Sequence, residues 1–522
     1  MEKERILILG AGVMQGPALN IAREMGLETV VVDADSNAVS IPLADRFEKI
    51  DLKDKEKIEA FARSLKENNG LAGIMTAGTD FSASVAWAAA KLSLPGISHE
   101  TALNASDKER MRRLFRDAGV PSPEFVIITD LPSKTPGFYL PFSWPAVVKP
   151  VDNMGSRGCR RVGSMEELEN AAIEALKFSR SGRAIVEEYM EGPEFSVDAL
   201  VYKGEITICG LADRHIFFPP YFIEMGHTMP TNLAPETCSR LLETFKKGVK
   251  ALGIDNGAAK GDVKLTPYGP MIGEIAARLS GGYMSGWTYP YSSGVLPTRG
   301  ALQIAVGRKP DQLEPKKSWT CAERAFISIP GRVHSLYGIE DAKAVPFVTD
   351  FFTRISEGSR VIFPENNVSK CGNILASAPA REDVVNAAES AARKALIRLA
   401  VPDESTEAFL AQSGSAFPPD AFVLDAGLKS LLEKLPDMEI SPGSVPCLLA
   451  FPEFIDSGLK DYMGRSVEES LAALRLITGL ELPLVSPNSG KPFLGRRFWA
   501  ALARGSYQGA AYIVDRCTSG RI

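Results

Sequence analysis

The chain has 522 residues and a net charge of −5, and its hydrophobic and charged fractions, 45% and 24%, are ordinary for a soluble globular protein. Single cores stop growing at roughly 250–300 residues, so we expect about three or four domains. The charge balance gives no sign of a nucleic-acid partner, and no stretch approaches the roughly 18 unbroken apolar residues of a membrane span. The seven scattered cysteines form no CxxC pair, which indicates reduced thiols, and a cytoplasmic location is expected.

The first hundred residues alternate between short apolar runs and helical segments. We expect strands at 6–9, 29–32 and 73–75, and helices at 17–25, 55–67 and 80–92. Strands that alternate with helices predict an α/β fold with a parallel, doubly wound sheet.

A glycine pair follows the first of these strands. Gly10 and Gly12, with Asp33 after the next strand, are typical of a dinucleotide-binding turn, but the third glycine of that motif is missing because position 15 is Gln15. We interpret the pair as a tight turn from strand to helix. An NAD(P)-dependent oxidoreductase stays open as a less favoured alternative.

The next segments change in character along the chain. Ser106 and Glu109 have capping-box spacing, which predicts a helix from Ser106 to about Ala118 with Lys108 in its first turn. Beyond it we expect strands at 145–149, 159–162, 184–187, 194–201, 206–211, 261–265 and 271–275, and helices at 166–176, 239–252, 382–399 and 466–478. The segment 402–420 is interpreted as a linker, and the aromatic residues near Trp499 are expected to pack in a small core.

A lysine and a glycine loop form the first chemical motif. Lys149 ends an apolar strand, and the loop 153–158 contains Gly155, Ser156, Arg157 and Gly158. Glycines let backbone N–H groups approach phosphate oxygens, and the serine adds a hydroxyl donor. The motif predicts a phosphate site, with an exposed hairpin as the alternative.

Two further motifs carry acids. The turn from Glu187 through Tyr189 and Met190 to Glu194 offers backbone groups to an adenine edge and a carboxylate to ribose hydroxyls, although a solvated acidic turn has the same composition. Asp262 and Glu274 end neighbouring strand segments, as expected of carboxylates that share a hard divalent ion, with a metal-free salt-bridged pair as the alternative. Four residues on, Arg278 offers a planar fork to a phosphate or carboxylate.

In order and spacing, these motifs resemble the ATP-grasp superfamily over residues 1 to about 400. The resemblance implies an N-terminal Rossmann-like domain and an α+β ATP-grasp domain. It also implies that Lys108 and Lys149 contact the phosphates of ATP beneath the glycine loop. Adenine is expected at Glu187 and at the backbone of Tyr189 and Met190, ribose at Glu194, and Mg²⁺, with Mn²⁺ as an alternative, at Asp262 and Glu274. Many members carry Asn where this chain has Ala276, which puts a second metal ion in doubt.

The loop from Phe222 to Pro230 is similar to a segment of bacterial L-amino-acid ligases, which make dipeptides. That likeness places Glu224, His227 and Arg278 at the amino-acid substrates. It implies an ADP-forming ligase that activates a carboxylate as an acyl phosphate and passes it to an amine. Another ATP-grasp activity, of the carbamoyl-phosphate or purine-pathway type, and a non-catalytic nucleotide-binding regulator remain as alternatives.

The expected domains are 1–105 (pre-ATP-grasp), 106–310 (ATP-grasp, with a lid at about 145–205), 311–400 (C-terminal ligase subdomain) and 401–522 (an additional module of unknown role). The expected partners are a small-molecule carboxylate and an amine, with neither nucleic acid nor membrane. The resemblance also allows a homodimer.

Overall fold

A computed structural model describes residues 3–68, 70–412, 417–436, 449, 450, 452, 455–485 and 494–518. The chain divides into two compact units: one contains Met1–Glu323 and Ser377–Val384, the other Arg324–Ala376 and Val385–Ile522. Among the described residues, no helix combines the length and hydropathy that crossing a membrane requires. The six cysteines that lie in the described residues are free, whereas Cys447 lies outside them.

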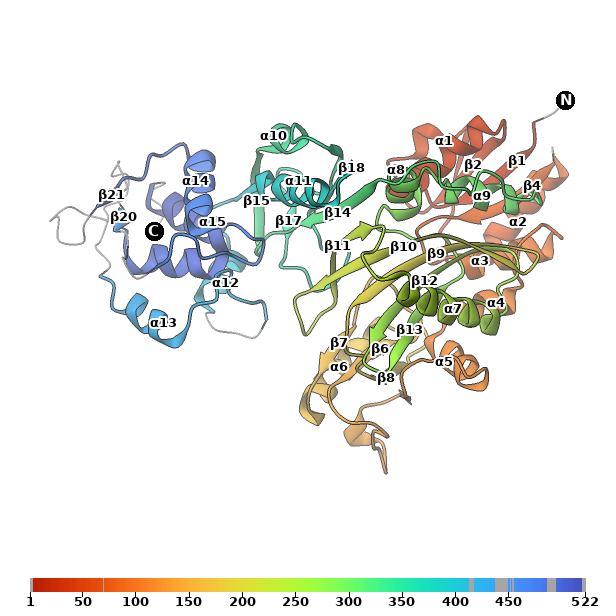
Figure 1. Cartoon of the computed structure of the whole chain (residues 1–522), viewed down its shortest axis with the longest axis horizontal. Helices are drawn as coiled ribbons and strands as arrows, with labels where there is room; N and C mark the ends of the chain where they lie inside the picture. The colour runs from red at the N-terminus through yellow and green to blue at the C-terminus, as the bar shows by residue number, and fades with distance from the viewer. Residues whose placement is uncertain are drawn as a thin grey trace. The chain divides into compact units, whose positions relative to one another are not determined.

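The first unit opens with a four-stranded parallel sheet in the order β3-β2-β1-β4 (Figure 1). Its elements are β1 (Arg5–Leu9), η1 (Val13–Gln15), α1 (Gly16–Glu24), β2 (Glu28–Asp33), η2 (Ile41–Leu43), β3 (Arg46–Lys49), α2 (Lys55–Glu67), β4 (Leu71–Thr76) and α3 (Ser82–Lys91). The predicted α/β fold is therefore confirmed. Since β2 and β4 flank β1 on opposite sides, the chain reverses its winding between β1 and β4, where open α/β sheets bind ligands at the strands' carboxyl ends.

Two helices follow, α4 (His99–Ser106) and α5 (Lys108–Asp117). The predicted capping box at Ser106 is wrong, because α4 extends to Ser106 and its hydroxyl donates to the carbonyl of Ala102 within that helix. Asp107, which has an extended backbone conformation between the two helices, is the N-cap of α5 instead. Its side chain accepts from the N–H of Arg110. Lys108 still lies in the first turn of α5, as predicted.

A small antiparallel sheet in the order β5-β8-β6-β7 comes next. It is built from β5 (Phe125–Ile128), η3 (Pro132–Lys134), β6 (Ala146–Pro150), β7 (Arg160–Val162), α6 (Met165–Phe178) and β8 (Ala184–Glu188). The glycine loop connects β6 to β7, so the predicted strand–loop–strand arrangement is confirmed. The buried face of α6, which includes Leu168 and Ala172, packs on this sheet.

The larger sheet of this unit has the order β13-β12-β9-β10-β11. Its elements are β9 (Glu194–Tyr202), β10 (Glu205–Phe217), β11 (Ile223–Met229), α7 (Pro235–Leu252), β12 (Gly257–Thr266) and β13 (Gly269–Ala276), followed by the π-helix η4 (Met284–Thr288), α8 (Tyr289–Ser293) and α9 (Pro297–Ala305). Phe245 and Val249 of α7 pack against Ile272 and Ile275, so one face of the sheet is core. The other face is left for polar side chains, because successive residues of a strand point to opposite faces.

The second unit joins short strands to helices. After β14 (Thr320–Phe326), which spans the boundary, come β15 (Gly331–Tyr337), α10 (Ile339–Lys343), β16 (Val348–Thr353), β17 (Arg360–Val361), β18 (Gly372–Ala378), α11 (Arg381–Lys394), β19 (Leu396–Leu399), α12 (Glu404–Ala411), α13 (Ala426–Glu433), β20 (Leu449–Ala450), α14 (Val467–Thr478), β21 (Leu484–Val485) and α15 (Arg496–Thr518). The Ser466 capping box is confirmed, and Trp499 lies in the predicted core.

Two predictions in this unit are wrong. The helix expected at 382–399 ends at Lys394, because Leu396–Leu399 pairs with β15 and buries its apolar side chains in the sheet. The expected linker 402–420 contains the helix α12. Asp403 caps the N-terminus of this helix, because its side chain accepts from the N–H groups of Ser405 and Thr406. Of that segment, residues 413–416 lie outside the described residues.

Candidate active site

The polar face of the larger sheet gathers most of the predicted site residues. The strand register sets Asp262 of β12 opposite Glu274 of β13 on one side and opposite Ser196 of β9 on the other. Arg214 of β10 lies opposite Glu194 and opposite His227. Ser196 and Asp262, which are 66 residues apart along the chain, thus become neighbours.

The two predicted metal carboxylates differ in their surroundings. Asp262, with a side chain 10% exposed, contacts Lys260 through Oδ1 and Arg214 through Oδ2, the latter at 3.2 Å. Glu274 is 39% exposed, and its Oε1 lies 3.3 Å from Nζ of Lys108. Burial alone would raise the pKa of both carboxyls, but the neighbouring cations outweigh it and lower both values. Both carboxylates are therefore ionised, as a metal ligand must be.

Lys108, one of the two lysines predicted to contact phosphates, is bonded to the glycine loop. Lys108 donates to the carbonyl of Asn153 at 2.9 Å, and so connects α5 to the loop. Gly155, Ser156 and Gly158 all have positive φ, which makes this a sharply turned segment with closely spaced backbone groups. Arg157 donates to the carbonyl of Met154 within the loop.

The carboxylate of Glu187 is fully engaged by cations. Its Oε1 accepts from Nε of Arg112 at 2.8 Å and its Oε2 accepts from Nζ of Lys149 at 2.7 Å. Burial alone would raise the pKa of Glu187, but these two cations lower it to about 2. Arg112 also donates to the carbonyl of Gly273, the residue before Glu274. Glu187 therefore orients Lys149, and of the residues predicted to contact adenine this leaves the backbone that follows Glu187.

Within that backbone segment, the ring of Tyr189 contacts two cationic side chains. Arg161 and Lys264 lie over its ring at 5.0 and 4.9 Å from the centroid, and Lys264 donates to the carbonyl of Met190 at 3.0 Å. Glu194 pairs with Arg214. The predicted adenine and ribose residues are thus brought to one end of the sheet, beside cations that suit phosphates.

The predicted substrate residues lie further along the same face. The segment that contains Glu224 and His227 was expected to be a loop, but it forms β11, whose backbone pairs antiparallel with β10 from Ile223 to Thr228. Glu224 accepts from Nε of Arg214 at 2.8 Å and lies 3.7 Å from Nε2 of His227. A side chain at Gly282 would approach Glu224 and His227 at 2.9 and 3.3 Å, so only glycine lets this loop close over them.

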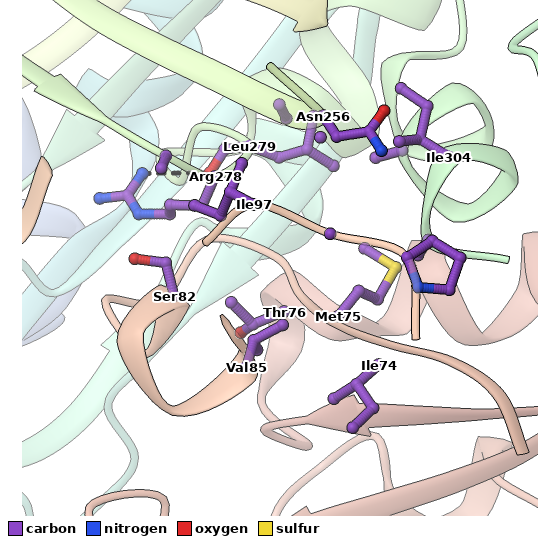
Figure 2. Close-up of a pocket in the computed structure, with 17 residues that line it drawn as sticks. Ile74, Met75, Thr76, Ser82, Val85, Ile97, Asn256, Arg278, Leu279 and Ile304 are labelled. Atoms are coloured by element: carbon purple, nitrogen blue, oxygen red, sulfur yellow. Dashed lines mark hydrogen bonds between the residues drawn. The ribbon is translucent and has the colours of Figure 1, made fainter. Parts of the chain in front are cut away.

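Arg278 borders the N-terminal sheet. It lines a cavity of about 70 Å³ with Thr76 and Ser82, and Figure 2 shows its guanidinium on the side of Ser82, away from Ile304. Nη1 donates to the carbonyl of Leu279 at 3.0 Å, whereas Nε is buried and has no hydrogen-bond partner within the described residues. The guanidinium therefore has donor capacity left for a ligand's carboxylate or phosphate.

The glycine turn after β1 favours the tight-turn interpretation. Asp33 accepts from the N–H groups of Ala11 and Asp35, and the buried side chain of Gln15 donates to the carbonyl of Ala77. In a dinucleotide-binding protein the carboxylate at this position would accept from the ribose, but here the Asp33 carboxylate accepts from nearby backbone N–H groups.

Four residues of this site were missed from sequence: Arg112, Arg214, Lys260 and Glu323. Arg112 had a signal, since it follows Lys108 by four positions and shares a helix face with it. For the other three residues the sequence signal was weaker: each is a charged residue within a strand that is otherwise rich in apolar residues.

Comparisons with known proteins identify the domain. A family model described as ATP-grasp domain matches residues 142–286, the region that contains the glycine loop and both predicted metal carboxylates. This region of the chain is therefore similar to ATP-grasp domains. A second model, described as L-amino acid ligase C-terminal domain 2, matches residues 325–400 of the chain.

The chain is also similar to whole proteins. An uncharacterized protein of Sinorhizobium fredii, y4rH, is 24% identical over 388 residues, which cover 73% of this chain and 80% of that protein. Carnosine synthase 1 of Homo sapiens is 24% identical over 338 residues, 59% of this chain but only 40% of that longer protein. The solved structure of an L-amino acid ligase from Bacillus licheniformis has the same fold, with a TM-score of 0.69, 22% identity, and coverage of 77% of this chain and all of that one.

Proposed function

We propose that this protein is a Mg²⁺-dependent, ADP-forming carboxylate–amine ligase that uses an amino acid and makes an amide bond through an acyl phosphate. The observation that carries the proposal is the polar face of the larger sheet, where the paired carboxylates Asp262 and Glu274 lie on strands joined by register to those of Glu194, Glu224 and His227. The L-amino acid ligase domain match, and the relatives named as an L-amino acid ligase and a carnosine synthase, support an amino acid as one substrate.

The paired carboxylates suit one hard divalent ion. No group of three or more His, Cys, Asp or Glu able to hold a metal occurs in the described residues. An ion bound by Asp262 and Glu274 would therefore complete its shell with phosphate and water oxygens, as Mg²⁺ commonly does. When bound, Mg²⁺ would neutralise charge on the transferring phosphoryl group.

The side chains divide the remaining work. Lys108 and Lys149 neutralise the phosphates, while Arg278 holds the substrate carboxylate in line with the γ-phosphate. Phosphoryl transfer to that carboxylate gives ADP and an acyl phosphate. Glu224 attracts the amino group of the second substrate, which attacks the acyl carbon and displaces phosphate. The protein mainly positions reactants and offsets charge.

The first test is a screen for ADP release over pairs of amino acids, with mass spectrometry of the products. An amide or dipeptide that appears only with ATP and Mg²⁺ supports the proposal. Release of ADP with bicarbonate or with a phosphorylated purine precursor, and without amide, would favour another ATP-grasp activity.

A second test separates the two half-reactions. Positional isotope exchange in ATP with the acid alone reports acyl-phosphate formation, and amide yield reports the full reaction. We expect His227→Ala to keep exchange but lose amide on the order of 10²-fold, because His227 lies outside the nucleotide residues. Arg278→Ala should lose both, since the carboxylate is no longer held. Full retention of both reactions by His227→Ala would give His227 a structural role only.

A further inference from the structure

His227 lies in a buried line of charged groups on the amine side of the site. Its Nδ1 is 2.9 Å from Oε2 of Glu323, and its Nε2 is 3.7 Å from Oε2 of Glu224. Both His227 and Glu323 are buried, whereas Glu224 is partly exposed. The imidazole thus stands between two carboxylates, one in the interior and one facing the site.

Glu323 determines which ring nitrogen can take part in chemistry. An ionised carboxylate only accepts hydrogen bonds, so Nδ1 carries the hydrogen that lies between it and Glu323. In the neutral ring Nε2 is then the basic atom, and it is the nitrogen on the Glu224 side. A buried carboxylate that fixes a histidine in this way is the arrangement of a catalytic triad.

We propose that Glu323 is a positioning residue, which holds His227 with Nε2 directed to the amine substrate so that the ring receives a proton during amide formation. The neutral amine attacks the acyl carbon, the N–C bond forms, and the C–O bond to phosphate breaks with its electron pair leaving on the phosphate. The proton lost by the nitrogen passes to Nε2. The resulting imidazolium lies between Glu323 and Glu224, whose charges stabilise it.

The surroundings of the ring support this role. The charged groups that face it in the described residues include Glu224 on its own strand, Arg214 across the register on β10, and Glu323 on β14. Arg214 is directed to Glu224, with a 2.8 Å contact, and so orients the second carboxylate as Glu323 orients the first. The loop at Gly282 lies directly against Glu224 and His227, since a Cβ there would approach them to 2.9 and 3.3 Å.

This inference rests on the proposed ligase activity, and the experiment separates the two. In the wild-type enzyme, amide formation and positional isotope exchange are measured between about pH 5 and 9. If the wild type makes no amide from any pair of acid and amine, the proposed function fails. If it does, the Glu323 variants test the inference alone.

Glu323→Gln keeps the shape of the side chain but removes its charge. We expect amide formation to fall on the order of 10- to 100-fold. We also expect the acidic limb of its pH profile to move to lower pH, because an uncharged partner stabilises imidazolium less. Isotope exchange with the acid alone should be unchanged. Glu323→Asp, which keeps the charge, should keep the wild-type limb at a reduced rate.

A matched control is Asp45→Asn, which removes a hydrogen-bonded carboxylate from the N-terminal domain, where Asp45 accepts from Thr29. It should alter neither reaction nor the pH profile. Wild-type amide rate and pH profile in Glu323→Gln would overturn the inference. Equal loss of exchange and amide would also overturn it, because Glu323 would then act at phosphoryl transfer. Should Glu323→Gln not fold, Glu323→Asp decides: a slower amide step with unchanged isotope exchange supports the inference, and a wild-type amide rate overturns it.

Discussion

Among single residues, Asp198 of β9 in the first unit is a buried acid whose pKa is raised. It is buried, its Oδ2 accepts from the hydroxyl of Ser280, and its Oδ1 has no hydrogen-bond partner within the described residues. Burial is the main cause that raises its pKa to about 6, while Ser280 and the charges of Lys260 and Arg278 oppose the rise. The folded protein therefore binds this proton more tightly than the unfolded chain does.

This raised pKa predicts a pH-dependent stability. Between about pH 4 and pH 6 the unfolded chain releases the proton first, so the free energy of unfolding should fall as pH rises, by about 3 kcal/mol in total. Asp198→Asn should remove that decrease and be the more stable protein at pH 7. Denaturant unfolding across this pH range measures the difference. Parallel curves for the two proteins would contradict the prediction.

A second prediction at this scale concerns the metal. Glu274 is the more exposed of the two paired carboxylates and contacts a single lysine at 3.3 Å, so we expect it to be the principal Mg²⁺ ligand. Glu274→Gln should abolish Mg²⁺-dependent ADP formation and leave ATP binding weakened but measurable. A Mg²⁺ titration of ADP release, paired with calorimetry of ATP binding, provides the measurement.

The control for this variant is Glu243→Gln, an exposed carboxylate on α7 that pairs with Lys246. It should behave as the wild type. Turnover near the wild-type rate in Glu274→Gln would remove Glu274 from the metal site.

At the scale of elements, the loop between β6 and β7 is held by Lys108, which donates to the carbonyl of Asn153, by Asn153, which donates to the carbonyl of Phe178, and by contacts within the loop. A loop that is rich in glycine and lies next to the lysines we assign to the phosphates is expected to close over a bound nucleotide. Hydrogen exchange at residues 153–158 should therefore slow when Mg²⁺ and an ATP analogue are added. The turn at Lys203 and Gly204, which joins β9 to β10, serves as the internal reference and should not change. Equal exchange with and without nucleotide would indicate a static hairpin.

At the scale of the whole molecule, the two compact units have separate cores. Trp499 of α15 is fully buried in the second unit and packs edge-on against Phe498, with ring centroids 5.2 Å apart. Replacing a buried aromatic by alanine costs about 3–5 kcal/mol. Trp499→Ala should destabilise the second unit by this amount while ATP affinity, which we assign to the first unit, stays unchanged.

Thermal unfolding with separate probes for the two units would measure this effect. Leu476→Ala, at an exposed position of α14, is the control and should cost little. A single transition that shifts as one would show that the two units unfold together, contrary to the prediction.

The sequence by itself determined the features that depend on local chemistry. The alternation of the N-terminal domain, the hairpin with its glycine loop, the Ser466 capping box and the position of Lys108 are all properties of short segments, and the structure has them. The order and spacing of Lys149, Asp262 and Glu274 were sufficient to indicate the superfamily. Where a local rule failed, as at Ser106, a neighbouring helix extended over the residue and used its hydroxyl.

Only the tertiary structure decided how these groups are paired. Arg112 meets Glu187 across 75 residues and His227 meets Glu323 across 96, and no spacing rule connects positions so far apart. The strand Leu396–Leu399 was predicted as the end of a helix because its partner β15 lies some sixty residues earlier in the chain. Which buried charge faces which is set by strand register and sheet order, and those follow from packing of the whole unit rather than from the sequence beside each residue.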